Sequence, residues 1–183
     1  MFILYAIVAG VVAGFALGGR LEPLASVRLR WRPLAIAGLV AQLALFTEAG
    51  ASLAGRLGPL VYVASTAAVL LVVLVNLRVP GLPLVAAGAA ANLAAIVANG
   101  GSMPADPAAL ASLGLTPGGA TNSVVLADPA LRPLTDIFAL PAWLPLANVF
   151  SVGDVLIGIG VAVAIALSMR RPATAATAQD PVR

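Results

Sequence analysis

Long apolar runs, each bounded by arginine, glycine or proline, dominate the pattern of this chain. A transmembrane helix needs about 20 mostly apolar residues, with a range of roughly 17–25. Runs close to that length predict helices over residues 2–19, 34–49, 59–77, 82–98 and 152–169. Small residues recur about every fourth position in the first of these and crowd the fourth, which predicts close helix packing. The pattern predicts an all-α membrane protein with about five transmembrane helices.

The distribution of arginine predicts the orientation of these helices. Cytoplasmic loops of membrane proteins carry the excess of basic residues. If the first connecting loop is cytoplasmic, only Arg56 and Arg132 of the ten basic residues lie outside. We therefore expect a multi-pass protein of the bacterial plasma (inner) membrane, with its N-terminus outside and its C-terminus in the cytoplasm. The predicted organisation is a single bundle over 1–172 and a disordered cytoplasmic tail over 173–183.

The segment between the fourth and fifth predicted helices, residues 99–151, is a long apolar outer loop. Its content of leucine, valine and aromatic residues is too high for a disordered linker. The stretch LPAWLPLANVF within it contains too much proline for a spanning helix, while Trp143 suits a membrane interface. We expect this loop to pack on the bundle as an interfacial or re-entrant segment.

Composition narrows the possible chemistry. The chain is 61% hydrophobic and 9% charged, whereas soluble domains carry about 25% charged residues, so the partner implied first is the lipid bilayer. Cysteine, histidine and lysine are all absent, which removes thiolate, imidazole and Schiff-base chemistry. The arginines lie in short loops, the pattern of topology determinants, so no nucleic acid is expected. No metal and no cofactor are predicted.

Two polar motifs frame the outer loop. The first, Asn99-Gly100-Gly101, follows the fourth predicted helix and fits a helix end and turn. The second runs from Asn148 to Asp154, where Ser151 suits a helix N-cap and Asp154, three residues later, completes a capping box. A functional interpretation of Asp154 is also open. Ionisable side chains are energetically unfavourable in a helix that is buried in lipid, and those found there usually have a function.

The functional interpretation gathers these residues into a polar pocket near the outer leaflet. Asn92 lies two helical turns before Asn99, and Asp136 could join them. The ligand-binding candidates are Asn92, Asn99, Gly100, Gly101, Asn148, Ser151 and Asp154. The catalytic candidates are Asp136 and Asp154, which would act as paired carboxyl groups.

Three ordered motifs, NGGSMP, LTDIFALP and NVFSVGDVLIGIG, resemble the domain-of-unknown-function 5317 family of small bacterial membrane proteins. The resemblance covers residues 1 to about 169. It implies an integral membrane protein and supplies no activity.

A weaker local similarity links Asn148–Asp154 to the second catalytic motif of lipoprotein signal peptidase, and Asp136 to a segment just before that motif. That peptidase uses two aspartates that share a proton. In the stretch that corresponds to its first motif, Ala91-Asn92-Leu93-Ala94-Ala95-Ile96, alanine replaces the acid. The similarity therefore keeps one of the two catalytic positions, and Asp136 would have to replace the other.

Three functional classes remain open from the sequence. The favoured one is non-enzymatic: an accessory subunit bound to another membrane protein, or a binder of a lipid or small apolar ligand. The second is a membrane aspartyl hydrolase that uses Asp136 and Asp154. The third is a small transporter, for which the sequence contains neither inverted repeats nor charged broken helices.

Overall fold

Residues 2–115 and 123–170 are described by the computed structural model. The chain is mostly helical, which confirms the all-α class. Five helices form the body: α1 (Phe2–Ala16), α3 (Arg32–Leu45), α5 (Gly58–Leu74), α6 (Leu82–Ala98) and α8 (Val152–Ser168). The predicted tail over 173–183 lies outside the described residues.

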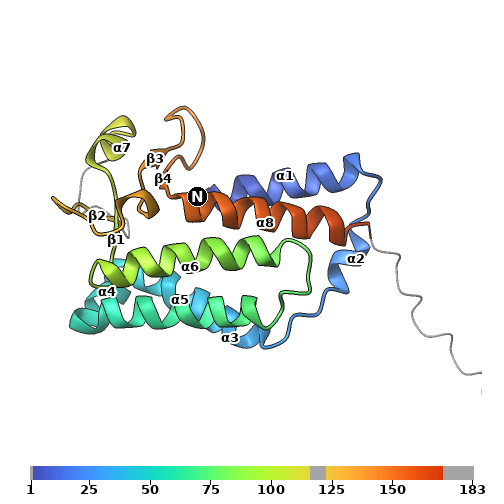
Figure 1. Cartoon of the computed structure of the whole chain (residues 1–183), viewed down its shortest axis with the longest axis horizontal. Helices are drawn as coiled ribbons and strands as arrows, with labels where there is room; N and C mark the ends of the chain where they lie inside the picture. Colours follow the sequence, from blue (N-terminus) through green and yellow to red (C-terminus); the bar gives the residue numbers. More distant parts are fainter. Residues whose placement is uncertain (1, 116–122, 171–183) are drawn as a thin grey trace, which may run out of the picture.

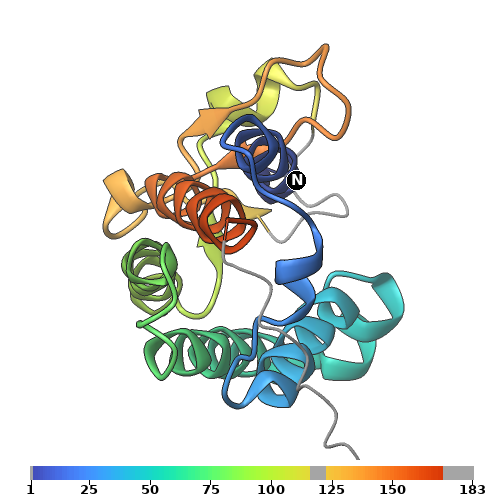
Figure 2. The ribbon, with the colours of Figure 1, turned by 90° about the vertical axis from the view of Figure 1, so that its right-hand side faces the viewer.

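The five helices stand side by side in one curved row (Figures 1 and 2). Within the row α8 packs between α1 and α6, and α5 packs between α6 and α3. The first and last long helices of the chain are therefore neighbours. The helices at the two ends of the row, α1 and α3, each have a single long helix as their main neighbour.

Shorter elements close the two ends of the row. One end carries the short helix α2 (Glu22–Ala25). The opposite end carries α4 (Glu48–Ala54), the 3-10 turn η1 (Gly55–Leu57) and the segment 99–151, which we call the cap. We refer to these as the α2 end and the cap end.

The cap is a folded unit that contains two small sheets. Strands β1 (Met103–Pro104) and β2 (Ser123–Val124) pair in parallel, and β3 (Phe138–Ala139) and β4 (Val149–Phe150) pair antiparallel. A short helix, α7 (Pro107–Ser112), and a 3-10 turn, η2 (Arg132–Leu134), complete it. A small apolar core of Ala105, Ala109, Leu110 and Val149 holds these pieces together.

Glycines set the close contacts of α8 with its neighbours. A Cβ atom placed on Gly160 would lie 2.6 Å from the carbonyl oxygen of Gly81 and 2.8 Å from the backbone nitrogen of Val85. On the other side of α8, a Cβ atom on Gly10 of α1 would lie 2.8 Å from the Cα atom of Ala162. Because glycine has no side chain, the helix backbones can approach this closely. Such packing is expected of small residues between helices in lipid.

Some helix ends differ from the expected ranges, and local hydrogen bonds explain why. The helix expected over 34–49 stops at Leu45, because Thr47 caps a new helix by accepting a bond from the backbone N–H of Gly50 (3.0 Å). The helix expected over 59–77 ends at Leu74. The side chain of Asn76 then donates to the carbonyl of Val72 (2.7 Å), which satisfies a helix-end acceptor.

The lengths of the helices matter for the membrane expectation. Among the described residues, one continuous helical stretch, Glu48–Leu74, is long and apolar enough to cross a membrane. It comprises α4, η1 and α5. The other four long helices are apolar but shorter, at 14 to 17 residues.

Candidate functional site

A ring of polar side chains joins α6 to the first turn of α8. The Asn92 side chain donates from Nδ2 to Oδ1 of Asp154, and its Oδ1 accepts from Oγ of Ser151, both at 2.8 Å. Ser151 and Asp154 are bonded to each other twice, since the backbone N–H of each donates to the side chain of the other at 3.0 Å. Ser151 is completely buried. Each of the three side chains is therefore anchored by the other two.

The local sequence explains this ring. Ser151 is in the extended conformation before α8, so its hydroxyl can accept a hydrogen bond from the backbone N–H of Asp154. The Asp154 carboxylate in turn accepts one from the backbone N–H of Ser151. This is the capping box expected from the sequence, with aspartate in the place of glutamate. Gly153 lies against Asn92, because a Cβ atom there would overlap the Asn92 amide oxygen. The absence of that Cβ lets the amide reach the cap of α8.

Asp136 lies in the cap, close to this ring. It is 6% exposed, and its backbone is fixed on both sides: its N–H donates to the carbonyl of Pro104, and its carbonyl accepts from the N–H of Asp106, both at 3.0 Å. Its carboxyl group receives no side-chain hydrogen bond from any other described residue. Burial, and secondarily the charge of Asp154, raise the pKa of Asp136 to about 7. The two carboxyl groups proposed from the sequence are therefore close enough to interact electrostatically.

The motif Asn99-Gly100-Gly101 ends α6. Gly100 and Gly101 have φ values of +70° and +88°, and the N–H of Gly101 donates to the carbonyl of Ile96 (2.8 Å) in a left-handed helix termination. The Asn99 side chain points toward another partner, since it exchanges two hydrogen bonds of 2.9 Å with the backbone of Ala130. These contacts tie the end of α6 to the cap and leave Asn99 bonded away from the ring.

Asn148 occupies a different position again, just before β4. Its Nδ2 donates to the carbonyl of Val149 at 2.8 Å. Its Oδ1 is buried and accepts no hydrogen bond from the described residues. Of the ligand-binding candidates, Asn92, Ser151 and Asp154 are thus directly bonded together, while Asn99 and Asn148 are bonded elsewhere.

The sequence gives no sign of a cavity in the cap that has both polar and apolar walls. It has a volume of about 280 Å³, and its polar lining includes Asp106, Asp128, Arg132 and Thr135. Arg132 donates to the Asp106 carboxylate (3.2 Å), and this hydrogen bond, with two from backbone N–H groups, lowers the pKa of Asp106. The dipeptide Asp106-Pro107 indicates a helix start in the sequence, but nothing in the sequence places it beside Arg132. The cavity is next to Asp136 in the chain but is not lined by it.

The chemistry that these groups can perform is limited. Among residues 2–115 and 123–170, no three side chains of the metal-binding types gather to hold a metal ion. What remains is a pair of carboxyl groups in unlike surroundings: Asp154 inside a ring of donors, and Asp136 in a buried site with a raised pKa. Such a pair could exchange a proton or hold a polar group of a ligand.

The two asparagines give a direct test of the ring. We expect Asn92→Ala to lower the free energy of unfolding by about 2–3 kcal/mol, because buried Ser151 and half-buried Asp154 both lose a partner. Asn148→Ala removes the same side chain where one polar atom already lacks a partner, so its cost is expected to be about 1 kcal/mol or less. Equilibrium unfolding in detergent measures both. Equal losses for the two variants would contradict the role assigned to the ring.

The fold and the site define a class of protein: it is mostly helical, and its row of apolar helices carries a folded cap that contains a buried carboxyl group, that of Asp136. Within that class, the family model for a family of unknown function, domain-of-unknown-function 5317, matches residues 26–166. The chain belongs to this family. No curated protein and no solved structure matches it.

Proposed function

We propose that this chain is a multi-pass integral membrane protein whose five long helices all cross the bilayer. The observation that carries the proposal is the exposure of large apolar side chains along the outer helices of the row. They include Leu4, Val8, Val12 and Phe15 of α1 and Ile36, Leu39, Val40 and Leu43 of α3. Such continuous apolar faces are unfavourable in water and are expected where the solvent is lipid.

Helix length is compatible with this proposal if the bilayer adapts to the row. At 1.5 Å per residue, the four helices of 14 to 17 residues span about 21–26 Å, less than a hydrocarbon core of about 30 Å. Local thinning of the bilayer and flanking interfacial residues accommodate a difference of this size at modest cost.

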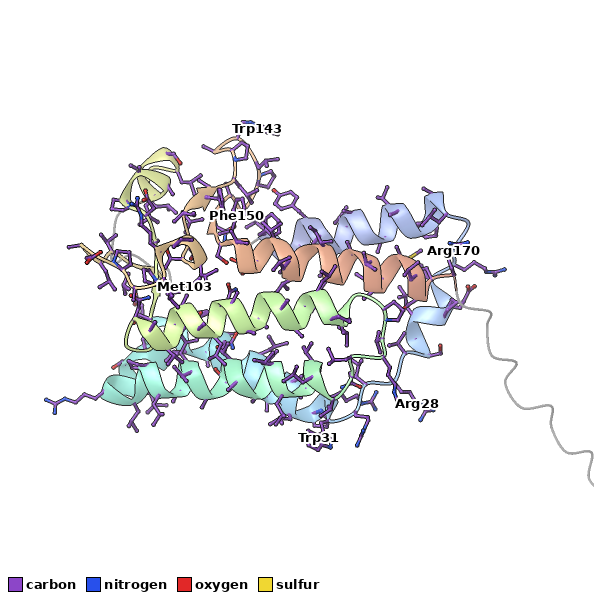
Figure 3. The ribbon with its side chains drawn as sticks, viewed as in Figure 1. Arg28, Trp31, Met103, Trp143, Phe150 and Arg170 are labelled. Carbon is purple, nitrogen blue, oxygen red and sulfur yellow. The ribbon has the colours of Figure 1, made fainter. Side chains whose placement is uncertain are left out.

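Charge at the two ends supports the orientation with the cap outside. Among the described residues, the arginines at the α2 end are Arg20, Arg28, Arg30, Arg32, Arg78 and Arg170. The cap end carries Arg56 and Arg132 together with five acidic residues: Glu48, Asp106, Asp128, Asp136 and Asp154. Figure 3 marks Arg28 and Arg170 at one end of the row and Trp143 at the other. Because basic loops stay in the cytoplasm, the α2 end is placed inside.

A matched pair of cysteine variants tests the orientation, since the chain has no cysteine of its own. Ser52 in α4 and Ser26 after α2 are both exposed and lie at opposite ends of the row. In intact cells, a membrane-impermeant maleimide is expected to label Ser52→Cys strongly and Ser26→Cys only after the membrane is permeabilised. Labelling of Ser26→Cys in intact cells would overturn the orientation, and release of the protein by alkaline carbonate would overturn membrane insertion.

For the molecular role, we propose a non-enzymatic one: an accessory subunit, or a binder of a lipid or small apolar ligand at the outer leaflet. The polar side chains of the ring are hydrogen-bonded to one another, which favours a structural role for them. Apolar groups surround the same end, where Phe150 stacks on Phe2 (4.7 Å between centroids) and on Phe138 (5.5 Å), and Trp143 is 81% exposed. Aromatic surface of this kind favours an amphipathic or apolar partner.

Affinity purification from the native membrane in a mild detergent, followed by native mass spectrometry, tests this role. We expect a lipid or a second membrane protein to remain bound. A matched variant, Trp143→Ala, is expected to weaken that retention, whereas Leu53→Ala, which removes an equally exposed apolar side chain from α4, is not. Recovery of the chain only as a free monomer without bound lipid would count against the proposal.

A second candidate function, hydrolysis by paired aspartates, is favoured by one observation. Asp136 has a pKa of about 7, raised by burial and by neighbouring Asp154, and unlike surroundings for two carboxyl groups are a pattern of acid–base pairs. Incubation of the protein with a fluorescent lipopeptide of the kind that lipoprotein signal peptidase cleaves tests it. If the parent protein cleaves the lipopeptide and both Asp136→Asn and Asp154→Asn fail to do so, the result would support hydrolysis. If the parent cleaves it no faster than the two variants, hydrolysis of this substrate would be excluded.

A further inference from the structure

The α2 end of the row contains a basic pocket that the proposed role does not use. It has a volume of about 360 Å³ and is lined by Ala25, Val27, Arg28, Leu29 and Arg32, all from the turn between α2 and α3 and its flanks. Two arginines therefore line one opening together with the apolar residues Ala25, Val27 and Leu29.

Neither arginine is neutralised within the described part of the chain. Arg28 and Arg32 form no ion pair and no side-chain hydrogen bond with another described residue. The one described acidic residue at this end, Glu22, is already held by Arg20, whose Nε and Nη2 donate to its two carboxylate oxygens at 3.0 Å. Within residues 2–115 and 123–170, the two positive charges of the pocket thus have no acidic partner.

The backbone of the turn is held in place. Asn76, just beyond α5, accepts from the N–H of Arg30 (2.8 Å) and donates to its carbonyl (3.0 Å). The next residue, Trp31, has a φ of +58°, an unusual value for a bulky residue. Because Asn76 is itself buried and bonded to α5, the turn has a fixed position between Arg28 and Arg32. The arginines therefore project from an ordered turn rather than from a flexible loop.

We propose that this pocket binds the phosphate group of an anionic phospholipid of the cytoplasmic leaflet. Arginine is well suited to phosphate, since its planar fork can donate two parallel hydrogen bonds. The apolar walls formed by Val27 and Leu29 suit the glycerol and upper acyl region that accompany a lipid headgroup, and basic pockets beside transmembrane helices recognise such headgroups. This inference rests on the membrane location and orientation proposed above.

Trp31 provides a reporter beside the pocket. The chain has two tryptophans, so Trp143→Phe leaves Trp31 as the single indole. This variant is placed in nanodiscs that contain either brominated phosphatidylglycerol or brominated phosphatidylcholine, because bromine quenches an indole that it contacts. We expect the anionic lipid to quench Trp31 at a lower mole fraction than the zwitterionic lipid.

The decisive comparison uses two double variants in that background. Arg28→Gln/Arg32→Gln removes the pocket charges, and Arg78→Gln/Arg170→Gln removes the same total charge from the same end outside the pocket. Loss of a guanidinium that is hydrogen-bonded to the bound phosphate costs roughly a fivefold factor in binding, whereas an arginine outside the pocket adds only a surface attraction that salt screens. We expect the first variant to lose about 25-fold in preference for phosphatidylglycerol, and the second to stay within about twofold of the parent.

Three results would overturn the proposal: equal quenching by the two lipids, equal loss in the two double variants, or displacement of brominated phosphatidylglycerol by inorganic phosphate at matched ionic strength. The last result would identify a site for a free anion instead of a lipid. Incorporation into the nanodisc is measured separately by size-exclusion chromatography. Failure to incorporate would therefore count against the membrane location, whereas loss of lipid preference in an incorporated protein would count against the pocket alone.

Discussion

Replacing Gly153 by alanine is expected to lower the free energy of unfolding by about 3 kcal/mol. The added methyl group would overlap the amide oxygen of Asn92 and lie 2.8 Å from the carbonyl oxygen of Gly88. Backbone atoms cannot move aside as a flexible side chain does, so α6 and α8 must separate. That separation would stretch the hydrogen bonds of Asn92 to Ser151 and Asp154, which adds the cost of unsatisfied buried polar groups to the steric cost.

A matched control for this substitution is Gly58→Ala at the start of α5. A Cβ atom there meets Leu45 at an ordinary 3.7 Å, and alanine also favours the helix more than glycine does. We expect Gly58→Ala to be neutral or slightly stabilising in the same unfolding measurement in detergent. A Gly153→Ala protein as stable as Gly58→Ala would contradict the close α6–α8 contact.

The second large effect concerns pH and Asp136. Its pKa is about 7 in the folded protein against an ordinary 3.8, so between these values the folded protein keeps a proton that the unfolded chain releases. Asp136 therefore contributes most to the free energy of unfolding below about pH 4. Its contribution falls as the pH rises and becomes constant above about pH 7. The corresponding loss of stability is on the order of 4 kcal/mol.

Asp136→Asn removes this titration while keeping the shape of the side chain. We expect the variant to match the parent near pH 4 and to exceed it in stability at pH 8, with the difference growing between those values. Chemical unfolding followed across the pH range measures the difference. Asp128→Asn, which alters an exposed carboxylate of the cap, is the control and is expected to leave the pH profile of the parent unchanged. Parallel profiles for Asp136→Asn and the parent would contradict the raised pKa.

The features that the sequence predicted are those that depend on residues close together in the chain. The helix over 82–98 occurs with those bounds, because Pro83 fits its first turn and Gly100 and Gly101 supply the left-handed backbone that ends it. The capping box of Ser151 and Asp154 also depends on residues three positions apart, and it was predicted. Both features are decided within one helical turn of the chain.

Contacts between distant residues could not be predicted in the same way. The strands of the cap are two residues long, too short to produce an alternating pattern. Asn99 bonds to Ala130, 31 positions away, and nothing near either residue indicates the other. The electrostatic contact of Asp136 with Asp154 depends likewise on how the cap folds back over α8. The sequence therefore named candidate polar residues one by one, whereas the structure alone shows which of them are bonded to one another.

The position of α8 has a consequence for the order in which the chain can assemble. Among the described helices, α8 follows all the others in the sequence, yet it lies between α1, which precedes them, and α6. Until the ribosome has produced it, α1 lacks its principal neighbour and the Asn92 amide lacks both of its partners. Before α8 is made, the earlier long helices form two separate groups, α1 alone and α3 with α5 and α6. Completion of the row is consequently a late event in biosynthesis, and α8 is the helix that joins the two groups.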